Sequence, residues 1–270
     1  MPDGVSRALS TGELPRRVCL LTGAGGTLGT AFCRRYAAEY DIVAVCRTRA
    51  PDVPSQHESY VDPLQPLADL LENQARVFTV QADLEQPGQV EQVIDLALAK
   101  FGRVDLLVNN AGYSRWHQKG LIDGDGALRD FDRHFAVNVA IPLRLAVRLG
   151  QQYWMHRDQD NRAHNRNIVN VSSLAGARVF PGQGQGVYAA SKAALNQLTR
   201  HLAAEFAVFG VRVNALAPNS FPSVVSTESV ARGIARLDHE SVTGRVLAVD
   251  APPDQDPDLD PDLDPDLDPS

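Results

Sequence analysis

A tyrosine and a lysine stand four residues apart in the segment YAASK, at Tyr188 and Lys192. On a helix, residues at this spacing share a face, so the lysine ammonium can lie near the tyrosine phenol. A free phenol has a pKa of about 10 and is a poor acid or base at neutral pH. A neighbouring cation stabilises the phenolate and lowers that pKa. The pair therefore predicts acid-base chemistry.

A glycine-rich segment, TGAGGTLG, follows a short apolar run and leads into an apolar stretch of helical period. Glycines there allow a tight turn and a close backbone approach, and a helix N-terminus offers free N–H groups to a pyrophosphate. Such glycines can also serve merely as a turn, but the strand before and the helix after favour a dinucleotide site. Its candidate residues are Gly23, Gly25, Gly26, Thr27 and Leu28.

The second apolar run ends at Cys46 and is followed by Arg47. A site for NAD has an acidic residue at this strand end, where it accepts hydrogen bonds from the adenosine ribose. An arginine instead suits the 2′-phosphate of NADP, because its planar fork makes paired, charge-assisted contacts with phosphate oxygens. We therefore expect NADP(H) in preference to NAD(H). The alternative is that Arg47 is a solvated residue at the end of a strand.

Three further polar segments lie beside apolar runs. NNAG ends the fourth run at Gly112, VSS ends the fifth at Ser173, and YAASK lies inside a predicted helix. The carboxyl ends of parallel strands meet at one edge of a sheet, and such folds bind their ligands there. We therefore expect these segments to meet at one site. The histidines show no metal-like clustering, so no metal site is expected.

The rest of the chain predicts the frame that positions these residues. Short apolar runs rich in Val, Ile and Leu alternate with longer stretches of helical period, which is typical of a parallel sheet covered by helices. We predict an α/β fold, a doubly wound and mostly parallel seven-stranded sheet with helices on both faces. Helices are expected over 28–40, 87–101, 129–155 and 187–209, with a last one after a short link over 218–227. The strands are expected to begin at Val18, Ile42, Arg76, Val104, Asn167, Val211 and Arg245.

The 270 residues suggest one domain between two tails. Residues 1–16 are polar and are expected to form a flexible extension, and residues 17–250 form the domain. Residues 251–270 are an acidic repeat of Asp and Pro, which can neither bury apolar surface nor continue a helix, so we predict disorder. Residues 49–74 contain four prolines and are expected to form a partly helical insertion.

The net charge of −7 comes from the C-terminal tail. Of the 33 acidic residues, eight are Asp at every second position from Asp254 to Asp268, which leaves 25 against 26 Lys and Arg. A near-neutral body argues against nucleic-acid binding. The chain shows neither the apolar run of a membrane span nor that of a secretion signal. Three widely spaced cysteines fit no disulfide framework, so we expect a cytoplasmic protein with reduced thiols.

As a set and in this order, the motifs resemble the short-chain dehydrogenase/reductase family over about residues 17–250. The resemblance implies a Rossmann fold and an oxidoreductase that transfers hydride between NADP(H) and a carbonyl or a secondary alcohol. It implies that Tyr188 protonates the carbonyl oxygen in reduction, or takes the hydroxyl proton in the reverse direction. Lys192 would lower the pKa of Tyr188 and hold the nicotinamide ribose. Ser173 would bond to the substrate oxygen, and Asn138 would hold a water that passes protons to Lys192.

The resemblance also implies the residues that contact the cofactor. Asp83 and Leu84 would line the adenine, and Ser223 would stand where a threonine often meets the carboxamide. Tyr188 and Lys192 would lie at the nicotinamide end. The remaining expected contacts come from the backbone of the NNAG segment and from the end of the sixth strand, at Asn110, Ala111, Gly112 and Pro218.

Several features leave alternatives open. Asp83 can be only a helix cap, and Asn138 only a satisfied amide inside a helix. Ser172 competes with Ser173 for the contact with the substrate oxygen. Thr27 stands where the common short form of the family has its second glycine, and the resulting spacing resembles family members that epimerise or dehydrate nucleotide sugars. A non-catalytic NADP-binding redox sensor is a further alternative, although a sensor has no need of a proton relay.

The segment after Pro218 is short for this family, with only about ten residues before the last helix. A short segment predicts an open pocket, suited to a bulky or carrier-bound substrate, or to one covered by a neighbouring subunit or by residues 113–126. Members of the family often associate through paired long helices. The resemblance therefore implies a homodimer or a homotetramer.

Overall fold

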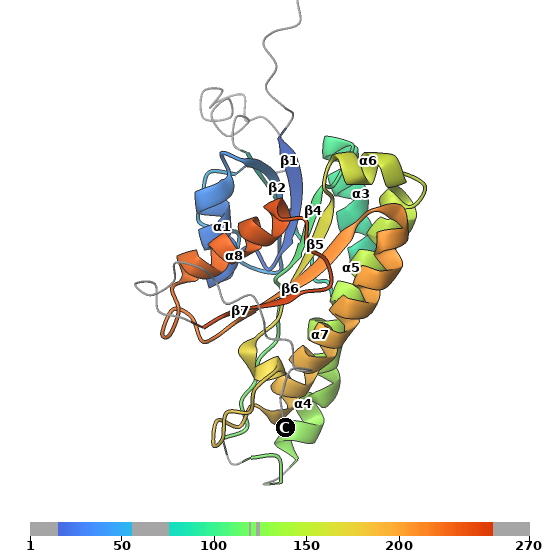
Figure 1. Ribbon diagram of the computed structural model, residues 1–270. Helices are drawn as coiled ribbons and strands as arrows, with labels where there is room; N and C mark the ends of the chain where they lie inside the picture. Colours follow the sequence, from blue (N-terminus) through green and yellow to red (C-terminus); the bar gives the residue numbers. More distant parts are fainter. Residues whose placement is uncertain (1–15, 56–75, 119, 123–124, 251–270) are drawn as a thin grey trace, which may run out of the picture.

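The computed structural model describes residues 16–55, 76–118, 120–122 and 125–250 (Figure 1). Seven strands form one sheet in the order β3-β2-β1-β4-β5-β6-β7, and each neighbouring pair is parallel. The prediction of a doubly wound sheet is confirmed, with small shifts at the strand ends. The strands are β1 (Arg17–Thr22), β2 (Tyr40–Cys46), β3 (Val77–Gln81), β4 (Leu106–Asn109), β5 (Asn167–Val171), β6 (Arg212–Pro218) and β7 (Val246–Val249).

Helices cover both faces of this sheet (Figure 1). One face carries α1 (Thr27–Tyr36) and α8 (Thr227–His239), which pack against each other. The opposite face carries α3 (Gln89–Phe101), α5 (Ile141–Leu149) and α7 (Gly186–Phe206). A buried strand between two helical layers must be apolar on both sides, which explains the continuous Val, Ile and Leu runs of the sequence.

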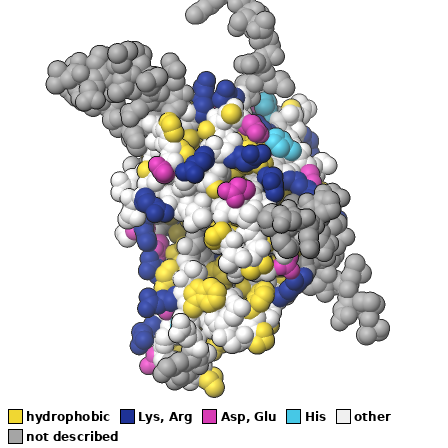
Figure 2. Space-filling model, turned by 90° about the vertical axis from the view of Figure 1, so that its left-hand side faces the viewer, with side chains coloured by type: hydrophobic (Ala, Val, Ile, Leu, Met, Phe, Trp, Pro, Cys, Tyr) yellow, Lys and Arg dark blue, Asp and Glu magenta, His cyan; other side chains and the backbone are white. Residues whose placement is uncertain are grey.

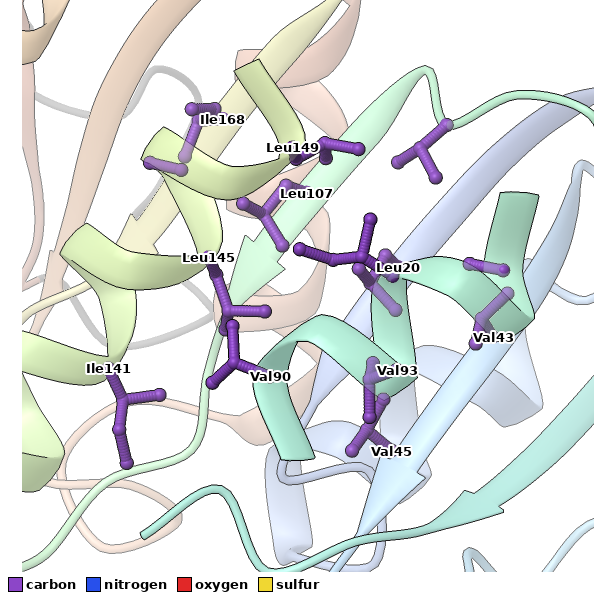
Figure 3. Close-up of a cluster of buried hydrophobic side chains, with 14 of the residues drawn as sticks. Leu20, Val43, Val45, Val90, Val93, Leu107, Ile141, Leu145, Leu149 and Ile168 are labelled. Atoms are coloured by element: carbon purple, nitrogen blue, oxygen red, sulfur yellow. The ribbon is translucent and has the colours of Figure 1, made fainter. Parts of the chain in front are cut away.

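Each face of the sheet has its own hydrophobic cluster. Figure 3 shows the cluster beneath α3 and α5, where Val90 and Val93 meet Leu145 and side chains from β1, β2, β4 and β5. The second cluster joins α1 and α8 to the other face, with Phe32 and Ile234 fully buried. Burial of a Leu, Val or Phe side chain stabilises a fold by about 1.5–3 kcal/mol, so both layers are firmly attached.

The predicted helix over 129–155 is a continuous helical element with an irregular backbone. It consists of α4 (Gly126–Phe135), η1 (Ala136–Ala140), α5 and η2 (Gly150–Trp154), and both η segments are π-helical. A π segment places an extra residue in a turn and often marks a functional site. Asn138 lies in η1, which hydrophobic periodicity alone does not reveal.

Two predicted helix boundaries differ from the structure. The first helix ends at Tyr36, four residues before the predicted end, because Glu39 N–H bonds to the oxygen of Tyr36 and Tyr40 begins β2. The helix predicted over 187–209 ends as α7 at Phe206 and closes with η4 (Ala207–Phe209), a 3-10 turn. A short helix, α6 (Asp158–Ala163), was not predicted, because six mostly polar residues carry no hydrophobic period.

The edge of the sheet opposite the carboxyl ends of the strands is closed by buried ion pairs. Arg17 contacts Asp238 at 2.8 Å, and the hydroxyl of Tyr40 donates to the same carboxylate at 2.8 Å. Arg166 and Asp105, both almost fully buried, lie 3.4 Å apart. Each of these charges has a partner of opposite charge, so burial at this edge leaves none of them uncompensated.

The three cysteines are free and buried, as expected for reduced residues of the core. Burial raises the pKa of the Cys33 thiol to about 12, and burial also raises the pKa of Cys46. Cys19 and Cys33 belong to the cluster beneath α1 and α8, whereas Cys46 ends β2 at the ligand edge. These thiols are therefore poor nucleophiles in the folded state.

The expected extension over 1–16 and the acidic tail over 251–270 lie outside the described residues, apart from residue 16. So does most of the insertion expected over 49–74, of which residues 49–55 are described. Within the described part of the chain, every helix is too short or too polar to cross a lipid bilayer.

Candidate cofactor and active site

The glycine-rich turn joins β1 to α1 and leaves the start of that helix uncapped. Gly26 occupies the N-cap without a side-chain hydrogen bond, and the first turn carries no acidic residue. Gly23 has a φ of +66°, and a Cβ there would lie 2.9 Å from the Cα of Ala111. A side chain at position 23 would thus be strained and would strike the NNAG segment, which explains the requirement for glycine.

Gly25 is held by Arg49 from the chain that follows β2. A Cβ on Gly25 would lie 1.7 Å from the backbone oxygen of Arg49. The guanidinium of Arg49 donates two hydrogen bonds to the oxygen of Gly25, at 3.0 Å from Nε and 2.7 Å from Nη2. The turn is therefore clamped by Arg49, and Gly25 and Gly26 line the cleft.

The NNAG segment is tied to the same turn by hydrogen bonds. Thr22 Oγ1 accepts from the N–H groups of Asn110 and Ala111, both at 3.0 Å. The Asn110 amide donates to the oxygens of Thr22 and Gly23, at 2.9 and 3.1 Å. These contacts bring together the ends of β1 and β4, as the sequence predicted, and leave Gly112 at the floor of the cleft.

A cleft of about 890 Å³ runs along the carboxyl ends of the strands. Many residues that the sequence predicted for the site line this cleft: those of the glycine-rich turn, Arg47, Asp83, Leu84, the NNAG backbone, Tyr188 and Lys192. Pockets of roughly 300–1,000 Å³ accept drug-sized ligands, so this cleft is large enough for an extended cofactor. Together with the uncapped start of α1, it fits a dinucleotide whose pyrophosphate lies at the helix N-terminus.

Asp83 also has the local role considered as its alternative. Its Oδ1 accepts a hydrogen bond of 3.2 Å from the N–H of Glu85, and its backbone oxygen accepts from the N–H of Gln86. This turn follows β3 and places both Asp83 and Leu84 on the wall of the cleft. A turn role and a ligand-facing position therefore coexist at Asp83.

Tyr188 lines both the large cleft and a second cavity of about 420 Å³. Burial raises the pKa of Tyr188 above its ordinary value, and a hydrogen bond with the Ser173 side chain opposes that rise. The expected lowering of the phenol pKa is therefore absent from this structure, because loss of solvation outweighs the hydrogen bond with Ser173. The phenol remains a proton donor that can reach either cavity.

Lys192 is buried beneath the tyrosine. Its Nζ lies 5.8 Å from the Tyr188 ring centroid and donates a hydrogen bond of 2.8 Å to the backbone oxygen of Val171. Burial lowers the pKa of Lys192 to about 8, so its ammonium can lose and regain a proton near neutral pH. A Cβ on Gly112 would lie 3.9 Å from this Nζ, which places the lysine at the cleft floor.

The side chain of Asn138 holds the backbone of Tyr113. Its Oδ1 accepts from the Tyr113 N–H at 2.8 Å, and its Nδ2 donates to the Tyr113 oxygen at 2.9 Å. The same Nδ2 donates to Ser191 Oγ at 2.9 Å, and that hydroxyl donates to the Tyr188 oxygen. The Asn138 amide is thus a satisfied link between the NNAG segment and the helix of Tyr188, and a relay role for Asn138 stays a prediction.

The two candidate serines differ in position. Ser172 is 3% exposed, and its hydroxyl donates to the backbone oxygen of Lys192 at 3.3 Å. Ser173 is partly exposed, bonds with Tyr188 and accepts from the N–H of Ala175 as the cap of the turn η3 (Leu174–Gly176). Ser172 lines both cavities and Ser173 lines the smaller one, but only Ser173 bonds with Tyr188, which makes Ser173 the better candidate for the substrate contact.

Of the two residues after β5 and α7 that were expected to contact the cofactor, Pro218 and Ser223, only Pro218 lies at a cavity. Pro218 lines the smaller cavity, but Ser223 is exposed, bonds to the Ser220 oxygen at 3.5 Å and lines neither cavity. Asn219 keeps an ordinary negative φ, and its amide donates to Asp250 at 2.6 Å. Asp250 also pairs with Arg178, so this link is braced by the end of β7.

The smaller cavity opens beyond Tyr188, where a substrate would lie. Aromatic side chains from three segments line it: Trp116 after β4, Phe180 before α7 and Phe221 after β6. Amide and hydroxyl groups complete its lining, including those of Ser173 and Gln185. Figure 2 shows hydrophobic side chains gathered in the lower half of the face that it presents.

The family model for short chain dehydrogenases matches residues 17–232. The chain belongs to the short-chain dehydrogenase/reductase family. It is 29% identical to 2-(R)-hydroxypropyl-CoM dehydrogenase from Xanthobacter autotrophicus, over 86% of this chain and 82% of that protein. A short chain dehydrogenase from Mycobacterium smegmatis has a similar structure, with a TM-score of 0.68, 29% identity, and coverage of 87% of this chain and 92% of that one.

A Brucella ovis oxidoreductase of the same family, crystallised with a partially ordered NAD, has a TM-score of 0.63 and 29% identity. The similarity covers 87% of this chain and all of that one. These likenesses confirm the family and the fold that the sequence motifs predicted. The short-chain dehydrogenase/reductase family is one of oxidoreductases that bind a nicotinamide cofactor.

Two charged residues of this short-chain dehydrogenase/reductase were missed by the sequence analysis. Glu85 follows Leu84, and Arg133 lies on α4, yet both line the large cleft. Arg133 comes from a part of the chain that shows no recognisable motif, and only the fold brings it to Glu85. Glu85 could have been predicted, because it directly follows Asp83 and Leu84, which the sequence had already indicated as cofactor contacts.

Proposed function

We propose that this member of the family transfers hydride between NADP(H) and a carbonyl compound or secondary alcohol. The position of Tyr188 between the two cavities supports this proposal most strongly, because a proton donor there reaches both a cofactor and a substrate. When bound, the cofactor supplies or accepts the hydride. The protein supplies orientation, a hydrogen bond to the reacting oxygen and a proton.

In the direction of reduction, the Ser173 hydroxyl donates a hydrogen bond to the carbonyl oxygen, and Tyr188 delivers the proton to that oxygen. Lys192 then restores the proton of Tyr188, since a pKa of about 8 lets the amine exchange protons at neutral pH. The fixed bond of Lys192 to Val171 keeps the ammonium at the cleft floor. In the direction of oxidation, the same groups take the hydroxyl proton.

The preference for NADP(H) is part of the proposal and rests on Arg47. Arg47 lies on the cleft wall where β2 ends, and its side chain is 55% exposed. A guanidinium in that position can bind the two extra charges of a 2′-phosphate. The Brucella ovis relative was crystallised with NAD, and titration of this protein with NADPH and NADH tests the preference.

The substrate proposed for the smaller cavity is bulky or carrier-bound. The segment that covers this cavity after β6 is short, and the half-exposed Trp116 leaves its aromatic wall in contact with solvent. We also propose self-association through the long helical element. Its exposed apolar residues Leu128, Phe131 and Leu143 support that contact, and a lower molar mass for Leu128→Asp in light scattering would support it further.

We place the protein in the cytoplasm, since three unpaired buried thiols suit a reducing compartment. Cell fractionation tests that location.

The test of the proposed function is a panel of carbonyls and alcohols followed at the nicotinamide absorbance with NADPH and with NADH. Turnover with NADPH at a lower KM than with NADH supports the proposal. Tyr188→Phe should bind the cofactor as the wild type does and lose about 10²–10⁴-fold in kcat. Wild-type turnover by Tyr188→Phe would overturn the role of the phenol.

Two other functions remain distinguishable in the same assay. The turn spacing through Gly23, Gly26 and Gly29 favours a sugar-nucleotide epimerase or dehydratase as the second candidate. That activity would convert a nucleotide sugar without net change in nicotinamide absorbance. A redox sensor would bind cofactor and turn over none of the panel.

A further inference from the structure

A carboxylate lies between two arginines on the wall of the large cleft. Glu85 Oε2 is 3.3 Å from Arg47 Nη1 and 2.9 Å from Arg133 Nη2, and Glu85 Oε1 is 3.1 Å from Arg133 Nε. The three residues come from the end of β2, the turn after β3 and helix α4, and all line the cleft. Glu85 therefore joins three separate segments at the place where the adenosine half of a cofactor would lie.

The two arginines hold Glu85 unequally. Arg133 makes two short bonds with it, one to each carboxylate oxygen, and its guanidinium also lies 4.6 Å from the Tyr113 ring centroid. Arg47 makes a single, longer contact and has the more exposed side chain. Paired contacts between a guanidinium and a carboxylate are the stronger ones, so Glu85 belongs mainly to Arg133. Arg47 is left able to turn toward another anion.

Arg49 is differently employed, although it also lines the cleft. Its Nε and Nη2 both donate hydrogen bonds to the backbone oxygen of Gly25. A phosphate near the end of β2 would thus be met by Arg47 and would be repelled by the charge of Glu85. The strength of that repulsion depends on how firmly Arg133 neutralises the carboxylate.

We propose that Glu85 limits the affinity of this cleft for a phosphate on the adenosine 2′ oxygen, and that Arg133 is a positioning residue whose paired contacts keep Glu85 from binding Arg47 more closely. The inference rests on the proposed use of NADP(H) and adds two determinants of cofactor choice. It concerns binding, so it is measured without a substrate.

The experiment titrates full-length protein with NADPH and with NADH and takes the ratio of the two Kd values for each variant. Glu85→Gln should tighten NADPH binding about three- to fivefold and leave NADH unchanged, which is the range of a partly exposed charge pair. Arg133→Gln should weaken NADPH binding by a similar factor, because the carboxylate freed from Arg133 then binds Arg47 more closely. In the double variant the effect of Arg133→Gln should vanish, since Arg133 acts through Glu85.

Glu91→Gln is the matched control. Glu91 contacts Arg144 at 3.4 Å and Arg148 at 3.1 Å on the surface of α3 and α5, so it copies the arrangement away from the cleft. Its substitution should change neither Kd. A variant of Glu85 that altered both cofactors equally would show a structural effect and overturn the inference.

The outcomes separate this inference from the proposed function. Wild-type protein that binds NADH more tightly than NADPH would overturn the proposed cofactor. Wild-type protein that prefers NADPH, with a ratio unchanged by Glu85→Gln, would overturn the role of Glu85 and leave the proposed function standing. An undiminished effect of Arg133→Gln in the double variant would show direct contact with the cofactor and overturn the positioning role.

Discussion

Lys192 Nζ donates a hydrogen bond of 2.8 Å to the backbone oxygen of Val171, the last residue of β5. The bond fixes an ammonium to the end of a central strand, one residue before the two candidate serines. Lys192 is 5% exposed. A buried ammonium of this kind lowers the stability of the folded state, and its use lies in the chemistry proposed for the site.

The first prediction concerns the stability of Lys192→Met. The native pKa of Lys192 is about 8, against an ordinary value of 10.5. At pH 7 Lys192 is protonated in the native state, so its lowered pKa destabilises the fold by about 3 kcal/mol. Lys192→Met removes that destabilisation but also loses the hydrogen bond to Val171, which contributes about 1 kcal/mol. We expect Lys192→Met to unfold roughly 4–8 °C higher at pH 7 and to be inactive.

The pH dependence of that difference has a definite sign. Between about pH 8 and 10.5 the unfolded chain binds more protons than the native protein, so the wild type gains stability as the pH rises. The variant gains nothing from this residue, and its advantage should disappear by about pH 10. Thermal melts at pH 7 and pH 10 measure this, and an equal advantage at both values would contradict the buried ammonium.

The second prediction separates the neighbouring serines. Ser173→Ala should lower kcat by about 10²-fold, because it removes a hydrogen bond to the reacting oxygen, while the cofactor Kd stays the same. Ser172→Ala removes a buried bond to the Lys192 oxygen and should cost about 1 kcal/mol of stability with a far smaller loss of kcat. Steady-state kinetics and melts of both variants decide the assignment, and a reversed pattern would make Ser172 the catalytic hydroxyl.

The third prediction concerns the glycine turn. In Gly25→Ala the new methyl would meet the Arg49 backbone at 1.7 Å, so the clamp must move. We expect a cofactor Kd at least about tenfold weaker and a loss of roughly 1–3 kcal/mol of stability.

Gly102→Ala is the control for that variant, because Gly102 has a φ of +70° at the end of α3 and a Cβ there would meet no atom within 4 Å. It should lose about 1 kcal/mol and keep its cofactor affinity. Equal cofactor affinity in Gly25→Ala and wild type would refute the role of the turn.

The fourth prediction concerns the aspartate repeat. Removal of residues 251–270 should leave the cofactor Kd unchanged, because the candidate site residues precede Asp250 and Asp250 itself is retained with its bonds to Arg178 and Asn219. The truncated protein should chiefly change in solubility, since eight negative charges are lost. A titration of both proteins with NADPH measures this, and weaker binding by the short form would make the repeat part of the site.

Much of the fold was accessible from the sequence because its strands are buried on both faces. The run VCLL at Val18 is apolar at every position inside the strand, and only a sheet between two layers of helices requires that. The end of α1 was missed because it depends on the turn into β2, and α6 was missed because its six mostly polar residues carry no hydrophobic period. The π-helical turn around Asn138 was missed because it has the composition of an ordinary helix.

The candidate site was accessible where its residues lie in local motifs at strand ends. The glycine turn, NNAG and YAASK each carry their own spacing, and the sheet brings their ends together. Arg133 has no local signal, because its role comes from the path of α4 across the cleft. The pKa of Tyr188 also escaped prediction, since burial is a property of the folded chain and not of a four-residue spacing.

The three buried cysteines allow local opening of this protein to be measured through the rate at which each thiol is labelled. Cys19 and Cys33 are fully enclosed beneath α1 and α8, so a thiol reagent can reach them only when that layer opens. Cys46 lines the cofactor cleft and needs only a local opening. The rates at which the thiols are labelled therefore report two motions of one molecule, and a bound cofactor should slow the labelling of Cys46 first.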